Sequence, residues 1–143
     1  MGKVNEDTFG SNTELIQQQV QKNKRILLMD DEPDVNFTIR LILEENEFKV
    51  DSFTDASQAL ENFTAGLYDL VMLDVKLPAM NGFGLYEEIR KLDDKVRICF
   101  LTAASITYYE LLKKHYPSIN ENCVIYKPVD YECLLRLIKS VLQ

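Results

Sequence analysis

Residues 69–74 read Asp69-Leu70-Val71-Met72-Leu73-Asp74, with four consecutive large apolar residues between two carboxylates. A strand with one solvated face alternates apolar and polar residues, so an unbroken apolar run of this length indicates a strand that is buried on both faces. Asp74 therefore stands at the carboxyl end of a buried strand.

Three other apolar runs also lead into polar residues. Residues 25–29 precede Asp30 and Asp31, residues 98–101 precede Thr102, and residues 124–126 precede Lys127. In a parallel α/β sheet the carboxyl ends of the strands lie at one edge, and such sheets bind their ligands there. The sequence therefore predicts one site, made of Asp30, Asp31, Asp74, Thr102 and Lys127.

Helical patterns separate these apolar runs. The first helix is predicted to begin near Pro33, because proline is favoured in a first helical turn, and the last near Asp130, a capping residue. Gly66 is expected to close the second helix. Strands are expected at 25–29, 48–53, 69–73, 96–101 and 123–126. Strict alternation of strands and helices requires crossover connections, which predicts an α/β fold with a doubly wound five-stranded parallel sheet and helices on both faces.

Length and composition are those of one globular domain. The chain has 143 residues, of which 46% are hydrophobic and 27% are charged, and no apolar stretch approaches the roughly 18 residues of a membrane span. Residues 1–24 form a polar leader with a short helical pattern, and residues 25–143 form the domain. The start resembles no signal peptide, so we expect a cytoplasmic protein without membrane contact. A net charge of −7 disfavours direct nucleic-acid binding.

The three cysteines lie in apolar contexts. Cys99, Cys123 and Cys133 have no metal-ligand spacing, so the sequence predicts buried, reduced thiols.

Three carboxylates at one edge of a sheet repel one another unless a cation joins them. All the candidate ligands are hard oxygens, which favours Mg²⁺ or Mn²⁺ over zinc. A carboxylate, a divalent metal and the Lys127 ammonium together suit phosphoryl transfer, in which the carboxylate is the nucleophile and the cations spread the charge of the phosphoryl oxygens. Thr102 is expected to donate a hydrogen bond to a further phosphoryl oxygen.

Several short motifs, taken in order, carry a resemblance to a known family. They are Met29-Asp30-Asp31-Glu32, Leu73-Asp74 followed by Pro78 and Asn81-Gly82, Leu101-Thr102-Ala103, and Tyr126-Lys127-Pro128. Together they resemble the receiver domain of two-component response regulators, of the single-domain kind found among chemotaxis regulators, over about residues 25–143.

The resemblance implies a flavodoxin-like fold and a set of roles. Asp74 would be phosphorylated by a histidine kinase or a phosphotransfer protein. Mg²⁺ would be bound by Asp31, Asp74 and the Lys76 carbonyl, with Asp30 acting through water. Lys127 would pair with the phosphoryl group and precede a cis proline bond, and Thr102 would be the switch hydroxyl. The output would be binding to a downstream protein, and the only catalysis would be on the protein's own Asp74.

Plainer interpretations of the same residues remain open. Asp30 and Asp31 would also favour the start of a helix through its dipole, Thr102 would also cap the following helix, and Lys127 would also suit a solvated surface. Many receiver domains carry an aromatic residue where this chain has Val124, three residues before Lys127. The coupling of phosphorylation to a surface change is therefore an open question.

Other functions compete with phosphorylation-dependent signalling. One is a phosphatase with an aspartyl nucleophile, but such enzymes of the haloacid dehalogenase type carry Asp-x-Asp after the first strand, which Asp30-Asp31-Glu32 does not supply. A second is a receiver that no longer switches by phosphorylation and acts as a binding module. A third is the front part of a longer transcription factor. The last helical pattern runs to Gln143 without a linker, so a free-standing regulator is expected.

Overall fold

The computed structural model describes residues 23–75, 82–103, 110, 114 and 123–143. The elements of these residues are β1 (Arg25–Met29), α2 (Pro33–Glu45), β2 (Lys49–Phe53), α3 (Ala56–Asn62), β3 (Leu70–Asp74), α4 (Gly82–Leu92), β4 (Arg97–Thr102), β5 (Val124–Tyr126) and α6 (Tyr131–Val141). Every strand boundary lies within one residue of the sequence prediction. Among the described helices, none has the length and apolarity needed to cross a membrane.

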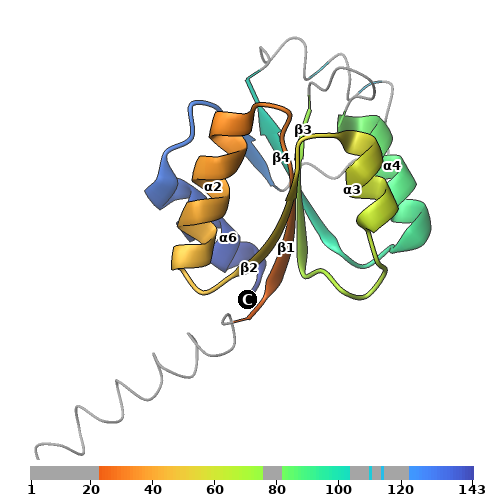
Figure 1. Ribbon diagram of the computed structural model, residues 1–143, viewed down its shortest axis with the longest axis horizontal. Coiled ribbons are helices and arrows are strands. Elements are labelled where there is room, and N and C mark those ends of the chain that lie inside the picture. The colour runs from red at the N-terminus through yellow and green to blue at the C-terminus, as the bar shows by residue number, and fades with distance from the viewer. Residues whose placement is uncertain (1–22, 76–81, 104–109, 111–113, 115–122) are drawn as a thin grey trace, which may run out of the picture.

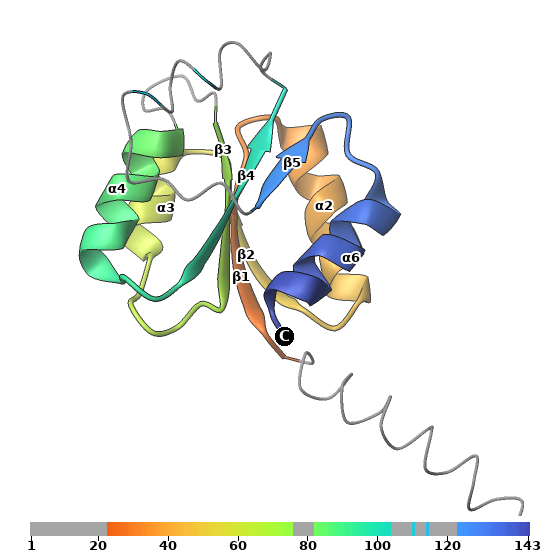
Figure 2. The same cartoon turned by 180° about the vertical axis from the view of Figure 1, so that it is seen from behind.

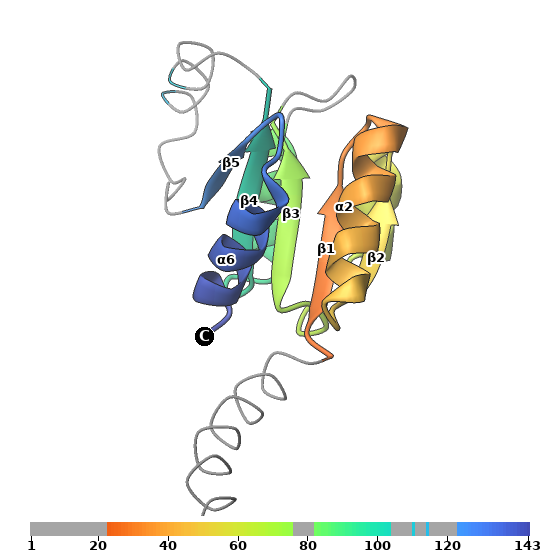
Figure 3. The same cartoon turned by 90° about the vertical axis from the view of Figure 1, so that its left-hand side faces the viewer.

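The five strands form one parallel sheet in the order β2-β1-β3-β4-β5. The arrows of the strands point the same way in Figure 3, so the carboxyl ends of the strands lie at one edge of the sheet. The predicted doubly wound parallel sheet with helices on both faces is confirmed.

Helices cover both faces of the sheet. In Figure 1, α2 and α6 lie on one side and α3 and α4 on the other, and Figure 2 shows the same arrangement from behind. Each face has its own apolar core, and β1 and β3 contribute alternate side chains to the two. Leu27, Val71 and Leu73 point to the α3 and α4 side, whereas Leu28 and Met72 point to the α2 and α6 side. Their complete burial explains why β3 lacks the alternating pattern of a half-solvated strand.

Local signals set where the helices begin. Pro33 occupies the first turn of α2, and the Asp130 carboxylate accepts hydrogen bonds from two backbone N–H groups at the start of α6, as the sequence predicted. The predicted end of α3 was wrong. The helix ends at Asn62 because Phe63 is already extended, with φ −69° and ψ 131°. Gly66 lies in a later turn with φ +82°, a conformation that glycine adopts without strain.

Some predictions fall outside the described residues. These are the helical pattern before residue 23, the Lys76 carbonyl with Pro78 and Asn81, and a helix that the spacing of Tyr108, Leu111 and Leu112 in the sequence predicts.

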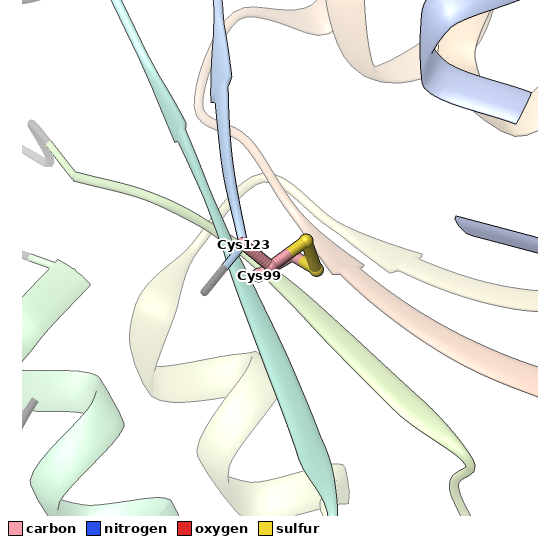
Figure 4. The surroundings of a disulfide bond; sticks show 2 residues. All are labelled: Cys99 and Cys123. Carbon is pink, nitrogen blue, oxygen red and sulfur yellow. A yellow bond between two sulfur atoms is a disulfide. The ribbon is translucent and has the colours of Figure 1, made fainter. Parts of the chain in front are cut away.

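The prediction of three buried, reduced thiols was wrong. Cys99 on β4 and Cys123 just before β5 form a disulfide, with their Cα atoms 4.6 Å apart (Figure 4), and Cys133 on α6 is exposed. The register explains the pairing. Phe100 lies opposite Val124 in the parallel pairing of β4 and β5. Cys99 and Cys123, the residues just before these two, are therefore neighbours on the same face of the sheet. The two cysteines are 24 residues apart in the sequence, so no local pattern indicates that they pair.

Candidate functional site: an acidic cluster around a buried lysine

Three carboxylates meet where the order of the strands reverses. The chain passes from β1 outward to β2 and then returns to β3 on the other side of β1, and ligand sites of open α/β sheets form at such a switch point. Asp30 and Asp31 follow β1, and Asp74 ends β3. One carboxylate oxygen from each of the three lies within 4.8 Å of the others. Asp30 and Asp74 are buried, whereas Asp31 is half-buried.

The Lys127 ammonium lies among these carboxylates. Its Nζ is 2.8 Å from Oδ2 of Asp30, 3.0 Å from Oδ2 of Asp74 and 3.1 Å from Oε1 of Glu32. The Lys127 side chain is only 8% exposed. Lys127 is therefore not the ordinary solvated lysine that the sequence left open.

The surroundings of Lys127 act on its pKa in opposite directions. Burial by itself would lower the pKa of the ammonium, because burial penalises the charged form. Hydrogen bonds and charges from Asp30 and Asp74 outweigh that effect and raise the pKa of Lys127 above its usual value. The ammonium is thus charged throughout the physiological pH range and can bind an anion.

Backbone hydrogen bonds position Thr102 and Lys127 relative to Asp74. The N–H of Val75, directly after Asp74, donates to the Leu101 carbonyl at 2.8 Å, and the N–H of Lys127 donates to the Thr102 carbonyl at 2.8 Å. The Thr102 side chain is buried at the end of β4. The Lys127–Pro128 peptide bond is cis, which confirms that prediction.

Asn36 and Gly82 support the site, and sequence reasoning gave neither of them this role. The side-chain amide of Asn36 donates to the carbonyls of Asp30 and Phe53, at 3.0 and 2.8 Å, and so holds the end of β1 against the end of β2. Its sequence signal is a polar residue on the buried face of a helix.

Gly82 starts α4 directly against the Asp74 carbonyl, and a Cβ there would collide with that oxygen. In the sequence, an Asn-Gly pair is typical of a turn, but it does not indicate this close approach.

Glu32 also belongs to the site. It appeared in the sequence only as part of a motif, without a role, yet its side chain contacts Lys127 and its backbone N–H donates to Oδ1 of Asp30 at 2.9 Å. The ion pair joins residues that are 95 positions apart, so no local signal could reveal it. The described structure thus brings Asp30, Asp31, Asp74 and Lys127 together and places Thr102 at the same edge of the sheet.

Comparison with known sequences identifies a protein family that this chain matches. Residues 26–139 match a family model described as the response regulator receiver domain. The chain is 34% identical over 119 residues to the response regulator ArlR of Staphylococcus saprophyticus, which is 83% of this chain and 52% of ArlR. It is 41% identical over 81 residues to the regulatory protein VanRB of Enterococcus faecalis, which is 57% of this chain and 36% of VanRB. The chain thus spans about half, or less, of the length of these relatives.

Solved structures share the fold. The non-phosphorylated receiver domain of HemR from Leptospira biflexa superposes with a TM-score of 0.75 at 29% identity, over 85% of this chain and 95% of that one. The response regulator TrrA from Thermotoga maritima, solved in complex with Mg²⁺ and BeF, gives a TM-score of 0.70 at 31% identity, over 83% of this chain and 99% of that one.

Proposed function

We propose, because the chain belongs to the family of response regulator receiver domains, that Asp74 accepts a phosphoryl group from a histidine kinase or a phosphotransfer protein. The observation that carries this proposal is the pairing of a buried Asp74 with the Lys127 ammonium at 3.0 Å, beside two further carboxylates. A fixed cation next to a carboxylate nucleophile is the arrangement that phosphoryl transfer requires.

In the proposed reaction, a carboxylate oxygen of Asp74 forms a bond to phosphorus. The bond from phosphorus to the donor breaks at the same centre, and its electron pair leaves with the donor, which is a histidine nitrogen in a kinase or acetate in acetyl phosphate. Lys127 donates a hydrogen bond to one phosphoryl oxygen, and Thr102 donates to another. The chain thus acts only on its own Asp74 and turns over no separate substrate, apart from the later hydrolysis of the acyl phosphate.

The donor set fits a magnesium ion. Asp31 and Asp74 would bind it directly together with the backbone carbonyl of Lys76, and Asp30 would act through a water molecule. Carboxylate oxygens within 4.8 Å of one another are hard ligands close enough to share one ion. Mg²⁺ would neutralise charge on the phosphoryl oxygens during transfer. The complex of TrrA with Mg²⁺ and BeF supports this assignment by analogy.

The proposed output is binding to a downstream protein. The chain's net charge of −7 argues against direct contact with nucleic acid, and we expect the protein to act in the cytoplasm. Val124 lies partly buried on β5, packed against the core on the α3 and α4 side. A branched side chain of this size cannot make the large rotamer exchange of an aromatic residue, so the signal must reach the surface by another route.

Acetyl phosphate and Mg²⁺ provide the direct test. We expect the intact protein to gain the mass of one phosphoryl group, and the Asp74→Asn variant to gain none, because an amide is not a nucleophile of this kind. Asp94→Asn, which changes an exposed acid in the connection between α4 and β4, serves as the control and should be labelled like the native chain. Equal labelling of Asp74→Asn would refute the assignment.

A further inference from the structure

Three carboxylates surround the Lys127 ammonium in this structure. Asp74 and Glu32 accept hydrogen bonds from its Nζ, and Asp30 forms an ion pair with it. An ammonium has three N–H donors, and Nζ of Lys127 lies within 3.1 Å of three separate carboxylates, those of Asp30, Asp74 and Glu32. A phosphoryl oxygen that approaches Lys127 must therefore compete with these carboxylates for the ammonium.

The three carboxylates differ in how easily they can leave. Asp30 is fully buried and also accepts the backbone N–H of Glu32, so its release would strand a buried charge. Asp74 has a side chain only 4% exposed and is the group that receives the phosphoryl. Glu32 is 56% exposed, so water replaces its contact with Lys127 at little cost. Glu32 is thus the partner that exchanges.

We propose that Glu32 is a positioning residue that holds the Lys127 ammonium in the unphosphorylated state and competes with the incoming phosphoryl oxygen for it. The proposal rests on the proposed phosphorylation of Asp74 and adds a determinant of its rate. Asp74 still forms the bond to phosphorus, and acetate or the histidine nitrogen still leaves with the electron pair. Glu32 takes part in no bond and acts only through Lys127.

The surroundings of Glu32 leave room for this exchange. Glu32 and Lys127 both line an open hollow of about 380 Å³ between the start of α2 and the connection from β5 to α6. The hollow gives the released carboxylate space to turn away from the ammonium. While Glu32 remains in place, its negative charge also opposes the approach of an anionic phosphodonor.

Removal of this carboxylate should therefore favour phosphorylation. In Glu32→Gln at saturating Mg²⁺, we expect the rate constant for labelling by acetyl phosphate to rise about two- to fivefold, the range for releasing an exposed ion pair. The dissociation constant for beryllofluoride, which mimics the phosphoryl group, should fall by a similar factor. The dissociation constant for Mg²⁺ alone should change less than about twofold, since Glu32 is not among the proposed ligands. A general loss of site structure would not produce this contrast.

Asp34→Asn is the matched control, because it removes one negative charge from an exposed residue two positions away. It should leave the labelling rate constant and the dissociation constants for beryllofluoride and Mg²⁺ at native values. A native protein that is not labelled at all would overturn the proposed function itself. A native protein that is labelled, with Glu32→Gln unchanged in both labelling rate and beryllofluoride affinity, would overturn only the role of Glu32. An equal gain in Asp34→Asn would also overturn that role, because it would show a general charge effect.

Discussion

Asp31→Asn should raise the stability of the protein when no divalent metal is present. Asp31 adds a third negative charge within 4.8 Å of the Asp30 and Asp74 carboxylates, whereas the ion pairs of Lys127 go to those two and to Glu32. Asp31 therefore contributes repulsion without taking part in these pairs. Its replacement by the similarly sized asparagine removes the charge and little else.

The magnitude follows from the distance. Two unit charges 4.8 Å apart repel by about 0.9 kcal/mol at the dielectric constant of water and by about 3.5 kcal/mol at an effective value near 20. Asp31 has two such neighbours, and the attraction of Lys127 cancels part of the sum. We expect a net gain of about 1–3 kcal/mol in the free energy of unfolding, or roughly 3–10 °C in Tm for a domain of this size.

Thermal melts in a chelator and over a Mg²⁺ series provide the assay. The native protein should gain stability as Mg²⁺ rises, by about 1.4 kcal/mol for each tenfold excess over the dissociation constant, and Asp31→Asn should gain much less. Asp30→Asn should not share the gain in chelator, because Asp30 is fully buried and paired with Lys127. Asp94→Asn should behave like the native protein. An Asp31→Asn protein that melts below the native one in chelator would refute the argument from repulsion.

Three further outcomes follow from the described residues. Gly82→Ala should lose about 1–3 kcal/mol of stability in chemical denaturation, because its Cβ would press on the Asp74 carbonyl, and an unchanged midpoint would contradict that contact. In the denatured but unreduced protein, thiol titration should find one reactive group, that of Cys133, and three after reduction; three before reduction would exclude the disulfide. Burial and a hydrogen bond to a carboxylate raise the pKa of Tyr68 to about 12, so ultraviolet titration of the native protein should show a late ionisation that Tyr68→Phe removes. Since this pKa is higher in the folded state, the stability contributed by Tyr68 should be complete below pH 10 and lost as the pH rises toward 12.

Much of the fold depends on local patterns, which is why the sequence alone predicts it. The unbroken apolar run before Asp74 indicates a strand buried on both faces, and Pro33 and Asp130 mark the starts of two helices through their own backbone and side-chain chemistry. The alternation of strands and helices then leaves few arrangements other than a parallel sheet. That arrangement also predicts which polar residues share one edge, because each of these acids and the lysine lies at the carboxyl end of its strand or just after it.

Contacts between distant segments could not be predicted in this way. The Cys99–Cys123 disulfide depends on the register between β4 and β5, and a shift of one residue would turn one cysteine to the opposite face of the sheet. The approach of Gly82 to the Asp74 carbonyl depends on how α4 starts against the end of β3.

The ion pair between Glu32 and Lys127 depends on the same long-range geometry. The sheet must first bring the carboxyl ends of β1 and β5 to one edge, with β3 and β4 between them, before Glu32 and Lys127, 95 residues apart, can form an ion pair. The sequence therefore determined the fold and the three aspartates of the site, because each of these follows from short-range pattern. Only the tertiary structure decided which carboxylates form ion pairs with Lys127. Those pairs depend on distances of a few ångströms between side chains that lie far apart in the sequence.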